Sequence, residues 1–153
     1  MPEAQVAQMF AQVASVAAGE GLDLRFDDVV VANSRRAHRL LHAAMGADPT
    51  GALAWDLKTR LFAAHFTEGE TISDPDRLAR LAVAAGLDDA VARAALDSPE
   101  RDAEVRADIT RASQLGIRGV PFFVLADSRL PDGGSGGRTR SGPGSLPECL
   151  DRE

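Results

Sequence analysis

Apolar residues recur at spacings of three and four through residues 2–115, and glycines, prolines and capping residues divide this region into helix-length segments. The first segment, Pro2 to Ala18, is followed by Gly19 and Gly21, which are natural helix stops. It places four apolar residues on one helical face: Val6, Met9, Val13 and Val16. Such a period is typical of amphipathic α-helices and predicts an α-rich chain over most of its length.

Five further helices are predicted from residues that cap or open helices. Their starts are placed at Asn33-Ser34, at Asp48-Pro49, at Ser73-Asp74-Pro75, near Asp88 and at Ser98-Pro99, and three of them close at Gly46, Gly86 and Gly116. The helix that starts at Asp48-Pro49 continues to about Thr67, and helical spacing favours core positions for its residues Trp55, Phe62 and Phe66. The other inward residues are expected to be Ala37, Leu40, Leu41, Ala44, Leu78, Leu81 and Ala82.

Three stretches depart from the helical period. Leu22 to Val31 contains three consecutive valines and is expected to be extended, whereas Ile117 to Ala126 contains GVPFFVL, a β-prone run of strand length. Asp127 to Glu153 has no periodic apolar positions and cannot bury enough surface to offset its ordering entropy. The sequence therefore predicts a mostly α chain in three parts: a helical domain at 2–115, a strand at 116–126 and a disordered tail at 127–153.

Charge and composition exclude several classes of function. The 153 residues carry a net charge of −6, which argues against binding to nucleic acid or to anionic membranes. No apolar run reaches the roughly 18 residues that a membrane span needs. Residues 1–10 lack the charge and apolar stretch of a signal peptide, so the cytoplasm is the expected location. The one cysteine, Cys149, excludes an intramolecular disulfide and a multi-cysteine metal site.

Five residues outside the core have alternative interpretations. His38 and His42 have the spacing of a two-histidine metal pair, but no third ligand stands nearby in sequence, so partly exposed histidines without metal are favoured. Glu68 and Glu70 could form an acid–base pair, although solvated loop residues beside Gly69 are the simpler interpretation. Cys149 is not expected to be a nucleophile, because nothing in the predicted tail would lower the pKa of its thiol.

Three blocks in register resemble the FrnE-type branch of the DsbA-like thioredoxin-fold oxidoreductases, which is also related to 2-hydroxychromene-2-carboxylate isomerases. Together they cover about residues 3 to 126. The blocks are Ala32-Asn33-Ser34 with Ala37-His38-Arg39-Leu40-Leu41; Leu61-Phe62, Phe66-Thr67-Glu68-Gly69-Glu70, Ile72-Ser73-Asp74 and Leu78; and Gly116-Ile117-Arg118-Gly119-Val120-Pro121-Phe122-Phe123.

The resemblance implies a thioredoxin fold with an inserted helical domain, whose activity is thiol–disulfide exchange on proteins or peptides that contain thiols. In such enzymes a C-x-x-C pair stands at a helix start, where the positive helix end lowers the cysteine pKa. The resemblance further implies a cis peptide bond at Val120-Pro121, with the backbone of Val120 facing substrate. It also places Asn33 and His38 near the active face.

This sequence departs from the family pattern in several places. The chain begins where the inserted helices of the family begin, so the strand and the C-x-x-C helix that precede them are interpreted as missing. The tail after residue 126 lacks the last strands and helix, and we interpret it as replaced or frame-shifted. Within the matching blocks, Ser34 replaces Thr, Arg35 stands where an aromatic residue is usual, and His65 replaces Tyr.

Three hypotheses about function follow. The first is a fragment of a DsbA/FrnE-type oxidoreductase that uses no cofactor and is inactive alone, because exchange needs an attacking and a resolving thiol. The second is a relative of the isomerases, for which glutathione would supply the thiol and would bind specifically. The third is a non-enzymatic helical binding module whose exposed strand, Val120 to Leu125, is covered by a partner or by self-association.

Overall fold

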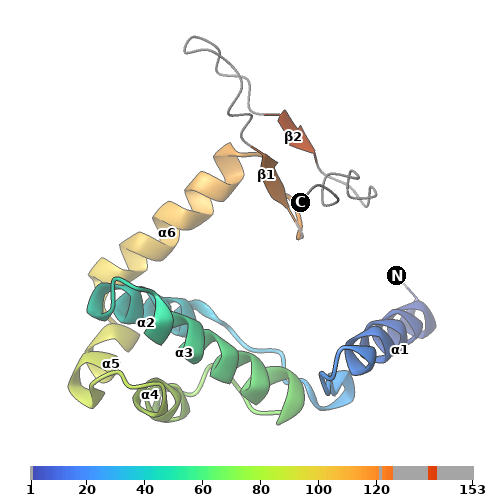
Figure 1. Ribbon diagram of the computed structural model, residues 1–153, viewed down its shortest axis with the longest axis horizontal. Helices are drawn as coiled ribbons and strands as arrows, with labels where there is room; N and C mark the ends of the chain where they lie inside the picture. The colour runs from blue at the N-terminus through green and yellow to red at the C-terminus, as the bar shows by residue number, and fades with distance from the viewer. Residues whose placement is uncertain (1, 121, 126–137, 141–153) are drawn as a thin grey trace, which may run out of the picture. The chain divides into compact units, whose positions relative to one another are not determined.

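The computed structural model describes residues 2–120, 122–125 and 138–140 (Figure 1). Most of them are helical, which confirms the predicted fold class. The helices are α1 (Glu3–Gly19), a 3-10 turn (Phe26–Asp28), α2 (Arg35–Ala47), α3 (Ala52–Phe62), a π-helical turn (Ala63–Thr67), α4 (Pro75–Ala84), α5 (Asp89–Leu96) and α6 (Pro99–Gln114). The chain divides into two compact units, Met1–Arg106 and Ala107–Glu153, so the boundary falls within α6.

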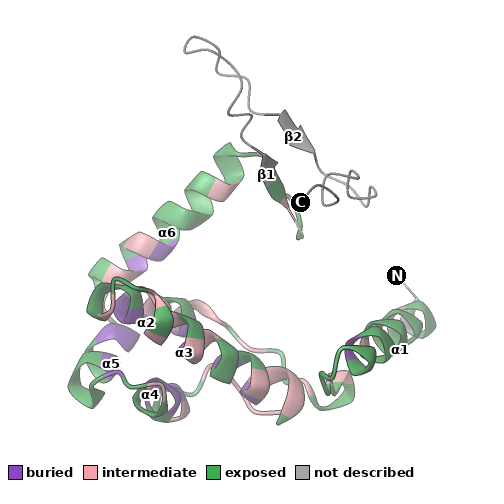
Figure 2. Cartoon of the chain, viewed as in Figure 1, coloured by how far each residue is buried: buried purple, intermediate pink, exposed green. Residues whose placement is uncertain are grey.

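The core of the first unit lies between α2, α3, α4 and α5, where buried residues gather on facing sides of the helices (Figure 2). Leu40, Leu57 and Leu78 are its largest fully buried side chains. Around them the core is built mainly of alanine, which lets the helix backbones approach closely. These fully or nearly fully buried alanines are Ala37, Ala43, Ala44, Ala64, Ala79, Ala82, Ala92 and Ala95.

Three of the predicted helix starts are confirmed by capping hydrogen bonds. The backbone N–H of Arg77 donates to Oδ1 of Asp74 at 2.6 Å, and Pro75 opens α4. The N–H of Val91 donates to Oδ1 of Asp88 at 3.1 Å at the start of α5. At α6 the N–H of Arg101 donates to Oγ of Ser98 at 3.2 Å. Each cap satisfies a donor that has no partner within its helix.

The predicted start of α3 at Asp48-Pro49 is wrong by three residues. The helix begins at Ala52 after Gly51, whose φ of +80° lies in the left-handed region. Thr50 and Gly51 therefore form a turn, and Pro49 is not the first helical residue. Asp48 still stabilises this end of the helix, because its Oδ2 accepts the N–H of Leu53 at 3.0 Å and its Oδ1 accepts the N–H of Thr50 at 2.9 Å.

The prediction that Trp55 and Phe62 belong to the core is also wrong, since they are 66% and 56% exposed. The two residues are seven apart and share one face of α3, while the opposite face buries Leu57 and Leu61. Trp55 instead makes a cation–π contact with Lys58, whose Nζ lies 3.5 Å from the ring centroid. Helical spacing alone does not say which of two apolar faces the core will use.

Phe66 is partly buried in a line of aromatic rings that joins the π-helical turn to α1. It meets Phe62 at a centroid distance of 6.0 Å and Phe26 at 6.2 Å, both edge to face. Phe26 in turn stacks on Phe10 of α1 at 4.7 Å. Otherwise α1 is mostly exposed, because Ala17 is its one buried residue among those whose side chains are described.

The segment between α1 and α2 is non-helical except for the 3-10 turn, and it lies against the end of the π-helical turn. The N–H of Arg25 donates to the carbonyl of Phe66 at 2.7 Å, and the hydroxyl of Thr67 donates to the carbonyl of Asp23 at 2.8 Å. Gly69 packs tightly on the same segment, since a Cβ built on it would lie 3.0 Å from the carbonyl oxygen of Asp28.

In the second unit two strands pair after the end of α6. β1 (Phe123–Leu125) pairs antiparallel with β2 (Arg138–Arg140), with Phe123 opposite Arg140. The predicted strand at 116–126 is thus present in its last part. β2 falls within the tail that the sequence predicts to be disordered, and its three residues instead pair with β1. The rest of that tail and Pro121 lie outside the described residues.

A candidate functional face at the start of helix α2

The residues predicted from the sequence to lie near an active face fall in two places. Asn33 and His38 are exposed at the start of α2, and Oδ1 of Asn33 accepts the N–H of Arg35 at 2.9 Å. Val120 is 92% exposed and belongs to the second unit. Pro121 and Cys149 lie outside the described residues, so the cis bond at Val120-Pro121 stays a prediction.

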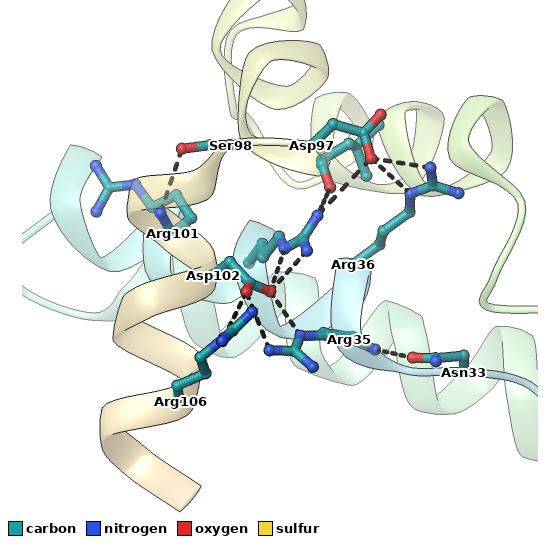
Figure 3. Close-up of polar contacts among 10 residues, drawn as sticks. Asn33, Arg35, Arg36, Asp97, Ser98, Arg101, Asp102 and Arg106 are labelled. Atoms are coloured by element: carbon teal, nitrogen blue, oxygen red, sulfur yellow. Dashed lines mark hydrogen bonds and ion pairs between the residues drawn. The ribbon is translucent and has the colours of Figure 1, made fainter.

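The start of α2 is fixed to α6 by one carboxylate that three arginines share (Figure 3). Oδ1 of Asp102 accepts Nε of Arg35 at 2.5 Å and the terminal nitrogen of Arg39 at 2.6 Å. Oδ2 accepts Nε of Arg106 at 2.9 Å and a terminal nitrogen of Arg35 at 3.0 Å. The side chain of Asp102 is 11% exposed and that of Arg39 16%, so this contact lies largely out of water.

The electrostatic effect of the cluster falls on Asp102. Hydrogen bonds from Arg35, then from Arg39, hold the pKa of its carboxyl well below the ordinary range, against a smaller effect of burial in the opposite direction. Asp102 is therefore ionised at neutral pH. A buried carboxylate paired with several guanidinium groups is costly to break, because removal of one partner leaves the other charges without compensation.

A second ion pair extends the contact to the end of α5. Nε and a terminal nitrogen of Arg36 donate to Oδ1 of Asp97 at 3.0 and 2.8 Å. Arg39 donates to the carbonyl of Leu96 at 2.6 Å and lies 3.7 Å from Asp97. We refer to the six side chains of Arg35, Arg36, Arg39, Arg106, Asp97 and Asp102 as the arginine cluster.

Sequence analysis missed most of this cluster. Arg35 stands where an aromatic residue is usual in the family, and the sequence gives Asp102 no predicted role. A signal was present, because Arg35 and Arg39 are four residues apart on α2, and Asp102 and Arg106 are four apart on α6. What the sequence could not indicate is that the two helices would place these faces against each other.

The other candidate residues each contact a charged side chain. Glu68 and Glu70 both contact the guanidinium group of Arg77, Glu68 at 3.1 Å, and their side chains are 50% and 37% exposed, so they are solvated residues that share one cation. Nδ1 of His42 lies 3.5 Å from Oε2 of Glu104. In the part of the chain that the structure describes, no three His, Cys, Asp or Glu side chains are grouped to hold a metal ion.

The chain is similar to proteins of known family and structure. A family model described as a DSBA-like thioredoxin domain matches residues 1–138. The crystal structure of a probable DsbA oxidoreductase from Streptomyces coelicolor matches with a TM-score of 0.71 and 35% identity, over 80% of this chain and 51% of that one. The structure of a candidate protein disulfide isomerase from Nitrosomonas europaea has a TM-score of 0.69 at 19% identity, over 91% and 66% of the two chains, which supports the fold alone.

A curated relative matches a shorter part of the chain. It is the uncharacterised protein YwbO of Bacillus subtilis (strain 168), which is 34% identical over 77 residues, or 50% of this chain and 38% of that protein. The chain therefore spans about half the length of the Streptomyces protein and well under half of YwbO. None of the helices in the described residues combines the length and apolar character needed to cross a bilayer.

Proposed function

The chain belongs to the DSBA-like thioredoxin domain family, a family of thiol–disulfide oxidoreductases, and we propose that it supplies the helical, substrate-facing part of such an oxidoreductase of the FrnE type. The helices at 2–115 correspond to the inserted domain. Residues 116–126 correspond to the return toward the thioredoxin sheet, with Val120 facing a thiol-containing polypeptide. The expectation of a cytoplasmic location stays a prediction.

The observation that carries the proposal is the combination of family membership with a single cysteine. Thiol–disulfide exchange proceeds when a thiolate attacks a disulfide, and a second thiol then resolves the mixed disulfide. The 153 residues have one cysteine, so they cannot perform both steps within one molecule. The catalytic pair must come from another polypeptide segment, and these residues by themselves are inactive in exchange.

The fold supports the division of labour in this proposal. The core between α2 and α5 is closed and rich in buried alanine and leucine, so the helical part has its own hydrophobic centre. Its face at the start of α2 exposes Asn33 and His38 and leaves the side chains of Arg35 and Arg36 40% exposed. A packed helical scaffold with an exposed polar face suits the positioning of a substrate beside thiols supplied from elsewhere.

Reduction of insulin by dithiothreitol, followed by turbidity, tests the proposal. The purified chain should give the same rate as buffer, because it has no cysteine pair that dithiothreitol could reduce and insulin could reoxidise. An authentic C-x-x-C oxidoreductase in a parallel assay should accelerate precipitation and so validate the conditions. A clear acceleration by the purified chain would show that exchange needs no paired thiols here and would overturn the proposal.

A further inference from the structure

We propose that the arginine cluster binds acidic polypeptide segments, whose side-chain carboxylates accept hydrogen bonds from its guanidinium groups. The inference rests on the proposed function, because it names the class of polypeptide that the α2 face takes. It concerns binding alone and requires no thiol. It can therefore be tested on the chain separately from any exchange activity.

The first argument is a surplus of positive charge. The cluster contains four arginines and two aspartates, which leaves a charge of +2, and α2 itself has three arginines and no acidic residue. The adjacent Arg101 and Glu104 form their own ion pair at 2.7 Å and do not change this balance. Glu100, whose charge acts on Arg101, reduces the surplus without cancelling it. The whole chain carries −6, so the cluster stands out against an acidic background.

The second argument is that most of these guanidinium groups remain accessible. The side chains of Arg35 and Arg36 are 40% exposed and that of Arg106 is 70% exposed. A guanidinium group has five N–H donors, and the contacts of Arg35 and Arg36 with Asp102 and Asp97 use two nitrogens each. The paired N–H donors of a guanidinium group suit bidentate binding of a carboxylate.

At Arg36, a carboxylate of a bound polypeptide can replace the carboxylate of Asp97 at a small cost in free energy. Its partner Asp97 is 70% exposed, and exposed ion pairs contribute little to stability. Asp102, in contrast, is largely buried and keeps Arg35 and Arg39 in position during binding.

The third argument favours a polypeptide over a nucleic acid. The chain just before α2 exposes Val30 at 46% and Val31 at 97%, so an apolar strip borders the basic surface. A segment that alternates acidic and apolar side chains matches both features. A polyphosphate would match only the arginines, and the acidic remainder of the chain would repel it along its length.

Fluorescence anisotropy with a rhodamine-labelled, cysteine-free peptide of alternating Glu and Leu tests this inference. The purified chain should bind this peptide at low ionic strength, and binding should weaken as salt rises, because the Debye length falls to about 10 Å at 0.1 M. The same peptide with Gln in place of Glu should bind much more weakly. A single-stranded oligonucleotide should not compete, and effective competition would contradict the assignment to polypeptides.

Three variants should change the affinity for the Glu–Leu peptide in three different ways. Arg36→Gln should weaken binding roughly fivefold, and Asp97→Asn should strengthen it by a similar factor, since each changes one charge at contact distance in water. Arg93→Gln is the matched control: Arg93 also pairs with exposed aspartates, Asp76 and Asp89, but outside the cluster, and its removal should change binding less than twofold. Circular dichroism confirms that each variant is folded.

Two outcomes would overturn the inference. One is equal binding of the Glu and Gln peptides, which would assign the contact to apolar side chains. The other is an equal loss in Arg36→Gln and Arg93→Gln, which would reduce the effect to net charge. Neither outcome bears on the proposed role in thiol exchange, because the probe contains no cysteine and the readout is not catalytic.

Discussion

Asp102 shows how one side chain can hold a helix in place with little apolar packing. Its carboxylate accepts hydrogen bonds from three guanidinium groups and connects α6 to the start of α2. Val105, one turn further along α6, is the nearby buried apolar residue. Because these contacts are ionic, the attachment of this part of α6 should depend on the ionisation of Asp102.

The pH dependence of stability tests the role of Asp102. Arginine hydrogen bonds lower the pKa of Asp102 in the folded chain, whereas an unfolded Asp titrates near pH ~3.9. Because the pKa is lower in the folded chain, the ionised carboxylate contributes its full stabilisation at any pH above the unfolded pKa. This contribution is lost as the pH falls below the unfolded pKa toward the folded one. Asp102→Asn should therefore unfold at a lower temperature than the wild-type chain at neutral pH, and the difference should shrink below about pH 4.

The matched control for this experiment is Asp76→Asn, which removes an exposed contact with Arg93. It should change the unfolding temperature very little at any pH. Thermal unfolding followed by circular dichroism gives both comparisons. If the difference between wild type and Asp102→Asn stays constant down to about pH 3, the hydrogen-bonded carboxylate is not its source.

Gly69 is required by the close approach of two segments. Its φ is +66°, and a Cβ would lie 3.0 Å from both the Cβ and the carbonyl oxygen of Asp28. Gly51 has a φ of +80° and no atom within 4 Å of a built Cβ, so it provides a control with the same backbone region and no clash. Gly51→Ala should cost about 1–2 kcal/mol, and Gly69→Ala should cost clearly more.

Urea unfolding of the two glycine variants measures this difference. An equal loss of stability in both would mean that the backbone angle alone explains the glycine, and that the segment around Asp28 moves aside without cost. The contacts around Gly69 also explain part of the family resemblance. The block from Phe66 to Glu70 carries hydrogen bonds, ion pairs and this close packing, so its role in the described structure is architectural.

At the scale of helices, the sequence predicted boundaries better than faces. Asp74 and Asp88 cap α4 and α5 as expected, because an N-cap is a local interaction between residues three apart. Trp55 and Phe62 were placed wrongly, because the choice between two apolar faces of α3 depends on which face meets α2 and α4. The arginine cluster was missed for the same reason, since it forms between helices far apart in sequence.

The burial of α4 gives a direct test of the core. Leu78→Ala should lower the free energy of unfolding by roughly 2–5 kcal/mol, because Leu78 is fully buried and the chain around it cannot fill the cavity. Val83→Ala lies on the same helix at 44% exposure and should cost far less. Urea unfolding compares the two, and similar losses would contradict a core centred between α2 and α5.

At the scale of the whole molecule, the resemblance in three sequence blocks predicted the family, and the family match over residues 1–138 confirms it. The blocks were informative because they combine local capping signals with residues that make specific contacts between segments. The role of Val120 in facing a substrate stays a prediction. The pairing of β1 with β2 was not predicted, since its register depends on contacts distant in sequence.

The central claim is that the family chemistry requires paired thiols, and that these residues have one cysteine. Oxidation of a reduced dithiol peptide in a glutathione redox buffer tests it most directly, with the wild-type chain compared with Cys149→Ser. We predict that both proteins give the same rate as buffer alone. A rate above buffer that disappears in Cys149→Ser would contradict the account.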